Sequence, residues 1–160
     1  MADPLRFALS NLRRHNVPLV WAQFNGWLTE SIIVSSGEPR TMLSRETHAR
    51  LSMMADAGLG DLVSVDIQET AGEERMISAP AFILGELALG TATPKQDNAE
   101  EGWHRWRSRT ISIGGRPAAL HVSGILGADF LSDFDEVTFR STNPDTVGPD
   151  LLILQDIAPV

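Results

Sequence analysis

Three residues with catalytic potential, Ser35-Ser36-Gly37, follow directly on the apolar run Ile32-Ile33-Val34. A serine hydroxyl acts as a nucleophile only when a base lies within hydrogen-bond reach. His48 and His121 are the candidate bases, but the chain has no Gly-x-Ser-x-Gly elbow. Ser36-Gly37 alone is too little for serine catalysis. We therefore interpret His48 as a surface or partly buried residue and His121 as a structural residue.

A second stretch, residues 103 to 109, interleaves aromatic and basic side chains as Trp-His-Arg-Trp-Arg-Ser-Arg. This combination can bind single-stranded nucleic acid or an acidic peptide. As a strand it would place Arg105, Arg107 and Arg109 on one face, because side chains alternate along a strand. We favour a solvated edge strand that partly balances an acidic protein. Between these two interpretations lies a third, in which the basic residues of this stretch pair with the acidic tip of the hairpin at residues 63 to 78.

No metal site and no cofactor are predicted. The four histidines lack the spacing of a metal motif, and the chain contains no cysteine. Gly114-Gly115 is followed by neither the lysine nor the helix of a phosphate-binding loop.

Turn signals divide the chain into many short strands. Asn25-Gly26 is a strong two-residue turn between strand-like residues 18 to 24 and 27 to 34. Residues 63 to 78 predict a second hairpin with a polar tip at 69 to 74. Further strands are expected over residues 82 to 89, 107 to 113, 118 to 122, 137 to 139 and 151 to 154.

Helices are expected to be few and short. Ser44 can cap a helix that runs to about Ala57 and stops at Gly58, with the Met53-Met54 pair filling the core. Residues 128 to 134 predict one or two helical turns. Many short strands with few helices predict an all-β, barrel-like domain.

The N-terminus is expected to be helical. Leu5, Ala8, Leu9 and Leu12 would share one face of a short helix over residues 4 to 14, and Pro4 suits its first turn. We therefore divide the chain into an N-terminal helical extension, residues 1 to 16, and one domain, residues 17 to 160.

Three segments in this order resemble the retropepsin-like (clan AA) aspartic proteases. The first joins the hairpin and the apolar strand to Ser35-Ser36-Gly37 and then to Arg40-Thr41-Met42-Leu43-Ser44. The second is the hairpin at residues 63 to 78, which lies where that family has its flap. The third, Gly124-Ile125-Leu126-Gly127-Ala128-Asp129-Phe130-Leu131, resembles the segment and helix near the family's C-terminus. The resemblance covers roughly residues 17 to 156.

The resemblance implies a single-lobe acid protease barrel that works as a C2 homodimer. Each copy of such a dimer supplies one aspartate, and the two carboxylates share a proton and activate a water. It also implies that Thr70, Ala71 and Gly72 form the flap tip that binds the ligand. Ile125, Leu126 and Gly127 would pack behind the catalytic loop and hold it rigid.

The sequence departs from the family at the decisive position, where Ser35 stands in place of the aspartate. Ser36 and Gly37 match the hydroxyl residue and the glycine, while Glu38 replaces a small residue. Loss of a general base typically costs ~10²–10⁴-fold in rate, and a serine is no base near neutral pH. Glu30 and Glu38 are interpreted as solvated carboxylates that do not replace it. We expect no peptidase activity.

Three hypotheses follow. The chain is a non-catalytic pseudoprotease that dimerises and binds a peptide or protein in the former cleft. Alternatively, it is a genuine aspartic endopeptidase inactivated by an Asp-to-Ser substitution at position 35. In the third hypothesis it is a β-barrel interaction domain unrelated to proteolysis.

The composition limits the classes of partner that we expect for this chain. The net charge of −8 argues against general nucleic-acid binding, which needs a basic surface. No apolar run approaches the ~20 residues that span a bilayer, and the first residues do not form a signal peptide, so we expect a cytoplasmic protein without membrane contact. The expected partner is a second copy of the chain, because the apolar strand Leu151-Leu152-Ile153-Leu154 needs a neighbour.

Overall fold

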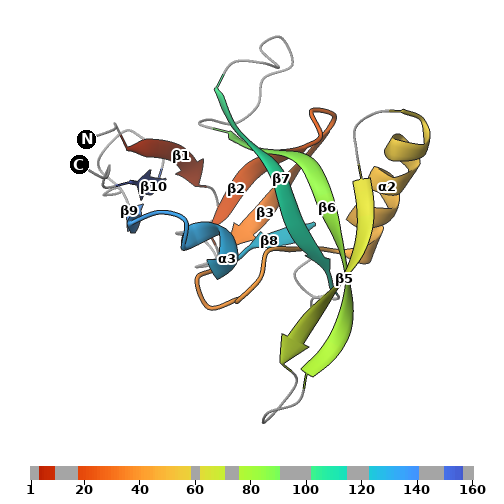
Figure 1. The fold of residues 1–160 in the computed structure, drawn as a ribbon. Helices are drawn as coiled ribbons and strands as arrows, with labels where there is room; N and C mark the ends of the chain where they lie inside the picture. Colours follow the sequence, from red (N-terminus) through yellow and green to blue (C-terminus); the bar gives the residue numbers. More distant parts are fainter. Residues whose placement is uncertain are drawn as a thin grey trace.

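A computed structural model describes residues 4–9, 18–58, 62–70, 76–90, 102–114, 123–140 and 150–156. The elements in chain order are β1 (Leu5–Leu9), β2 (Leu19–Phe24), β3 (Leu28–Val34), β4 (Met42–Leu43), α2 (Arg45–Asp56), β5 (Leu62–Thr70), β6 (Met76–Gly90), β7 (Trp103–Ile113), β8 (Gly124–Leu126), α3 (Ala128–Leu131), β9 (Glu136–Arg140) and β10 (Asp150–Gln155) (Figure 1). The predicted all-β class with short helices is confirmed.

Most strands belong to one sheet that closes into a barrel. The strand order is β2-β3-β8-β4-β7-β6-β5, and an additional pairing between β2 and β6 closes the ring and leaves β5 outside it. Figure 1 shows α2 on one side of the barrel and the sheet of β1, β10 and β9 on the other. In a closed barrel each strand pairs with a neighbour on both sides, so even short strands such as β4 and β8 are held in place.

The core lies inside this barrel and follows the alternation of the strands. Side chains with at most 1% exposure include Val20, Ala22, Phe24, Ile32, Leu43, Phe82, Leu84, Leu87, Leu89, Ile111 and Leu126. Leu51 of α2 joins the same cluster at 1% exposure, so the helix docks through that residue. Burial of large apolar side chains supplies the main stabilising free energy.

Both predicted hairpins are present. Asn25 (φ 53°) and Gly26 (φ 74°) form the tight turn between β2 and β3, where left-handed backbone suits these two residue types. The second hairpin pairs β5 with β6 from Leu62 opposite Leu84 to Thr70 opposite Met76. Its predicted tip beyond Thr70 and the predicted strand over residues 118 to 122 lie outside the described residues.

The predicted helix cap is confirmed. Ser44 Oγ accepts a hydrogen bond from Thr47 N at 3.1 Å, and α2 ends at Asp56, shortly before Gly58 (φ 82°). The prediction that both methionines fill the core is wrong for Met53, which is 72% exposed, whereas Met54 packs against the core. Among the described residues, no helix is both long enough and apolar enough to cross a membrane.

The prediction of an N-terminal helix is wrong for Leu5–Leu9. These residues form β1, which pairs antiparallel with β10, and alternation buries Phe7 and Leu9. A strand partner about 145 positions away in the chain therefore overrides the local helical pattern. The boundary proposed at residue 16 lies outside the described residues.

β10 is the middle strand of its sheet. It pairs with β1 on one side and with β9 on the other, so the apolar run Leu151–Leu154 already has two neighbours within the chain. The argument that this run needs a second copy of the chain is therefore wrong. The edges of the small sheet are β1 and β9.

Candidate functional site

Ser35 lies immediately after β3, where the chain turns away from the sheet. Its N–H donates to the carbonyl of Leu126 at 3.0 Å, which extends the parallel pairing of β3 with β8 by one residue. Glu38 N in turn donates to the Ser35 carbonyl at 3.4 Å, closing a tight turn. Ser35 is half-buried, while Ser36 and Gly37 are exposed on the turn. The three predicted residues thus lie together at the tip of one loop.

The segment after β8 packs tightly behind this loop. A Cβ on Gly127 would lie 2.5 Å from the Arg40 carbonyl carbon, so only glycine fits there. Ala128 N donates to the Glu38 carbonyl at 2.7 Å, and Asp129 N donates to that of Pro39 at 3.1 Å. Two backbone hydrogen bonds and one close backbone contact therefore attach the loop to the start of α3.

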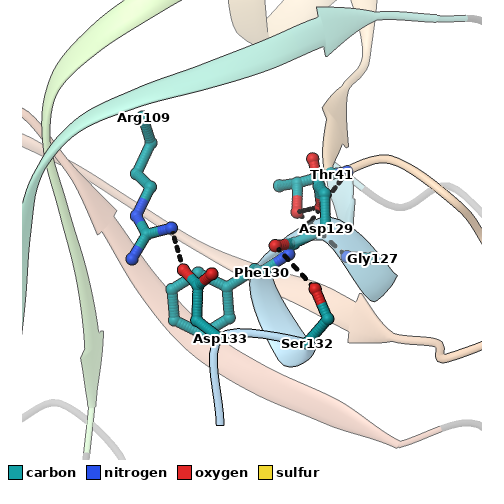
Figure 2. Close-up of polar contacts among 7 residues, drawn as sticks. All are labelled: Thr41, Arg109, Gly127, Asp129, Phe130, Ser132 and Asp133. Carbon is teal, nitrogen blue, oxygen red and sulfur yellow. Dashed lines mark hydrogen bonds and ion pairs between the residues drawn. The ribbon is translucent and has the colours of Figure 1, made fainter.

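One carboxylate oxygen organises the end of the loop (Figure 2). Asp129 Oδ1 accepts from Thr41 N at 2.8 Å, from Thr41 Oγ1 at 2.7 Å and from Phe130 N at 2.8 Å. Thr41 Oγ1 also accepts from Gly127 N at 3.0 Å. This network joins β4, β8 and α3. We did not predict from the sequence that Thr41 and Asp129 interact. The available signal was that both residues lie in segments that resemble the same protein family.

A row of side chains crosses the sheet on the same face as Ser35. Residues that pair in register share a face, and Ile33 pairs with Ile125, Ile125 with Met42, and Met42 with Ser112. Ile33 precedes Ser35 by two positions and therefore lies on its side of the strand.

The row continues across the remaining two strands. Ser112 pairs with Ala81, and Ala81 pairs with Val65 of the β5–β6 hairpin. Ile33, Met42 and Val65 are half-buried, so part of this apolar row is accessible. We call these six residues, from Ile33 to Val65, the floor row.

Glu30 is not a solvated side chain, so that prediction is wrong. Its carboxylate pairs with Arg50 of α2 at 2.7 Å and accepts from Ser123 Oγ at 3.0 Å, and its side chain is 21% exposed. Glu30 lies on the same face of β3 as the buried Ile32 and Val34, opposite that of Ile33. It therefore braces α2 against the start of β8. Glu38 is half-buried in the loop.

His48 lies on α2 with its ring 4.9 Å from that of Phe82. Its Nε2 is buried and has no hydrogen-bond partner among the residues that the structure describes. Burial lowers the pKa of His48 below its ordinary value of 6.5. The prediction of a surface or partly buried residue fits His48, which is half-buried. His121 lies outside the described residues.

The prediction that Arg105, Arg107 and Arg109 share one face is wrong. Ser108 has φ 53°, a left-handed conformation that interrupts the alternation of β7. Arg109 consequently turns to the side of Trp106, and both side chains contact the ring of Phe130. Arg105 instead pairs with Glu86 at 2.7 Å. Arg105 and Arg109 thus have different partners, which the alternation rule alone could not show.

No protein-family model matches the chain, and no curated protein matches its sequence. The crystal structure of a retropepsin-like aspartic protease from Rickettsia conorii is similar, with a TM-score of 0.50 and 16% sequence identity over 95% of this chain and 90% of that chain. The chain thus has a retropepsin-like, all-β fold.

Proposed function

We propose that this protein is a retropepsin-like aspartic protease domain without its catalytic aspartate, a homodimeric pseudoprotease that binds a peptide or protein in the former cleft. The observation that carries the proposal is the position of Ser35. It lies at the loop tip after β3, tied by its backbone to Leu126 and backed by Gly127. A retropepsin needs a carboxylate at that tip, and a hydroxyl cannot share a proton with its symmetry mate.

The floor row supports the peptide-binding part of the proposal. Accessible apolar side chains beside Ser35 provide the kind of lining that a bound chain buries. The β5–β6 hairpin extends beyond the barrel (Figure 1) and contributes Val65 to the row. We assign to this hairpin the role of a flap, whose tip the sequence predicts at Thr70, Ala71 and Gly72.

The architecture of a one-lobe barrel supports the proposed dimerisation. A single floor row offers one wall, and a cleft needs a second. A C2 partner would bring a second Ser35 loop and a second floor row to face the first. An alternative in which the barrel is an interaction domain unrelated to proteolysis would need no such arrangement.

The direct test is a cleavage assay with a diverse peptide library at acidic and neutral pH. The chain with Ser35 is expected to cleave nothing above the buffer background. Cleavage that persists in the presence of pepstatin would refute the proposal, because no aspartate dyad could produce it.

Ser35→Asp separates the pseudoprotease from an endopeptidase inactivated by substitution, an alternative favoured by the intact support of the loop. Two carboxylates would titrate as a coupled pair and give an acid-leaning rate profile. Pepstatin-sensitive cleavage by a folded Ser35→Asp dimer would favour the inactivated enzyme. A folded Ser35→Asp dimer that cleaves nothing would favour the pseudoprotease, with Glu38 as the next obstacle in the loop.

A further inference from the structure

A polar pocket opens beside the end of the Ser35 loop. It has a volume of about 270 Å³ and lies between the loop, the middle of β7 and the start of α3. Two guanidinium groups line it, those of Arg40 and Arg109, together with the hydroxyl residues Thr41, Ser108 and Thr110 and the carboxylate residue Asp129. The Thr41 hydroxyl already donates to Asp129, but the two guanidinium groups and the hydroxyls of Ser108 and Thr110 are hydrogen-bond donors that suit a ligand rich in acceptor oxygens.

Arg40 connects the pocket to the floor row. Its Nε donates to Ser112 Oγ at 3.1 Å, and Ser112 is the neighbour of Met42 in that row. The Arg40 side chain therefore lies beside the middle of the row and also lines the pocket. A chain that crosses the row beside Met42 would have this arginine within reach of its side chains.

Arg109 is turned into the pocket by a strained residue. The pairing of β6 with β7 skips Gly85 and Ser108, and Ser108 takes a left-handed backbone that a serine rarely adopts. The change of alternation places Arg109 against Phe130, with its guanidinium carbon 5.0 Å from the ring centre (Figure 2). Backbone strain in a pocket lining is a common mark of a functional site.

Asp129 lines the pocket and Asp133 pairs with Arg109, and neither carboxylate closes the pocket. Asp129 Oδ1 already accepts three hydrogen bonds from Thr41 and Phe130. Asp133 pairs with Arg109, but its side chain is 49% exposed. An exposed ion pair contributes little to stability and exchanges easily. A carboxylate from a ligand can therefore replace Asp133 on Arg109.

We propose that this pocket binds an acidic side chain of the peptide that lies along the floor row, so that Arg40 and Arg109 make the protein selective for acidic sequences. The inference rests on the proposed function for its source of ligand. Arginine recognises a carboxylate through paired, charge-assisted hydrogen bonds. Ile111 and Phe130 line the same pocket and would cover the methylene groups of a glutamate.

The test uses N-acetyl-glutamate amide and its uncharged counterpart, N-acetyl-glutamine amide, added to the isotopically labelled protein. The amide NMR signals of Arg109, Thr110 and Phe130 report on the pocket. The glutamate compound is expected to bind about tenfold more tightly than the glutamine compound, as expected for one charge-assisted hydrogen bond pair. Equal affinities would overturn the proposal, and so would a stronger response to inorganic phosphate.

Variants show whether the two arginines cause the selectivity. Arg40→Gln and Arg109→Gln are expected to abolish the preference, while Arg107→Gln, an exposed arginine of the same strand outside the pocket, should preserve it. Asp133→Asn removes the competing carboxylate and should strengthen glutamate binding severalfold. Loss of folding cannot mimic such a gain, so an unchanged or weaker affinity in Asp133→Asn would count against the proposal.

A peptide display selection separates this inference from the proposed function. Both proposals are supported if the recovered peptides carry an acidic residue and if Arg40→Gln weakens their binding. Recovered peptides without an acidic preference sink the pocket assignment and leave the peptide-binding cleft standing. If no peptide is recovered but the NMR shifts still show a preference for the glutamate compound, the peptide-binding cleft is refuted and the carboxylate-binding pocket is retained.

Discussion

At the residue scale, backbone atoms, the Asp129 carboxylate and a hydrogen bond from Arg40 to Ser112 hold the loop from Ser35 to Thr41. Leu126 O, Glu38 O and Pro39 O accept from the backbone, and Asp129 Oδ1 receives both donors of Thr41. The shape of the loop therefore depends on these groups. A change between serine and aspartate at position 35 alters the chemistry of the tip far more than its fold.

The Asp129 network gives the first prediction. Asp129→Ala leaves Thr41 N, Thr41 Oγ1 and Phe130 N without their acceptor, and buried unsatisfied donors cost about 1–3 kcal/mol. Urea unfolding should show a loss of this size. Asp133→Ala, which removes only an exposed ion pair, should cost below about 1 kcal/mol. Equal losses in the two variants would show that the network does not support the loop.

His48 gives a pH dependence. Because burial lowers its pKa in the folded protein, the unfolded chain binds more protons between that lowered pKa and 6.5. The free energy of unfolding should therefore fall as the pH drops through 6.5 and stop falling below the folded-state pKa. Unfolding curves of the wild type and of His48→Gln over this range would isolate the effect. A difference between them that is independent of pH would contradict the assignment.

At the scale of elements, β8 and the start of α3 act as one brace behind the loop. Gly127→Ala would push a methyl group to 2.5 Å from the Arg40 backbone, and such overpacking typically costs about 1–3 kcal/mol. A matched control exists in Gly37→Ala, where the nearest atom is Ser35 Oγ at 3.7 Å. Thermal unfolding should show a clear loss for the first variant and little change for the second.

Several elements could be predicted because their signals are local. The Asn25-Gly26 turn, the Ser44 cap and the alternation of Val63, Val65 and Ile67 each depend on a few neighbouring residues. The loop at Ser35 could be placed because an apolar strand leads into it. These features need no knowledge of distant partners.

Other features depend on contacts that are distant in the chain. Leu5, Ala8 and Leu9 fit a helical face, yet Phe7 and Leu9 equally fit the alternation of a strand, and only β10 decides between them. The orientation of Arg109 depends on a left-handed Ser108, a conformation that its residue type does not announce. The Arg40–Arg109 pocket exists only after the loop, β7 and α3 are brought together, so no local pattern could indicate it.

At the scale of the whole molecule, the proposed function requires two copies of the chain. The barrel is complete in one chain, and β10 already has β1 and β9 as neighbours, so folding alone does not demand a partner. The requirement comes from the proposed function, in which one floor row and one Ser35 loop form only half of a cleft. Dimerisation should consequently bring the two Ser35 loops face to face.

The absence of cysteine from the chain allows this central claim to be measured directly. Ser35→Cys introduces a single thiol at the loop tip, and Ser132→Cys places the control thiol at the end of α3. Treated with a short bifunctional maleimide at micromolar concentration, Ser35→Cys should form a covalent dimer in high yield, while Ser132→Cys should remain largely monomeric on denaturing gels. A Ser35→Cys protein that stays monomeric under these conditions, with a reactive thiol and a monomer mass by light scattering, would contradict the account.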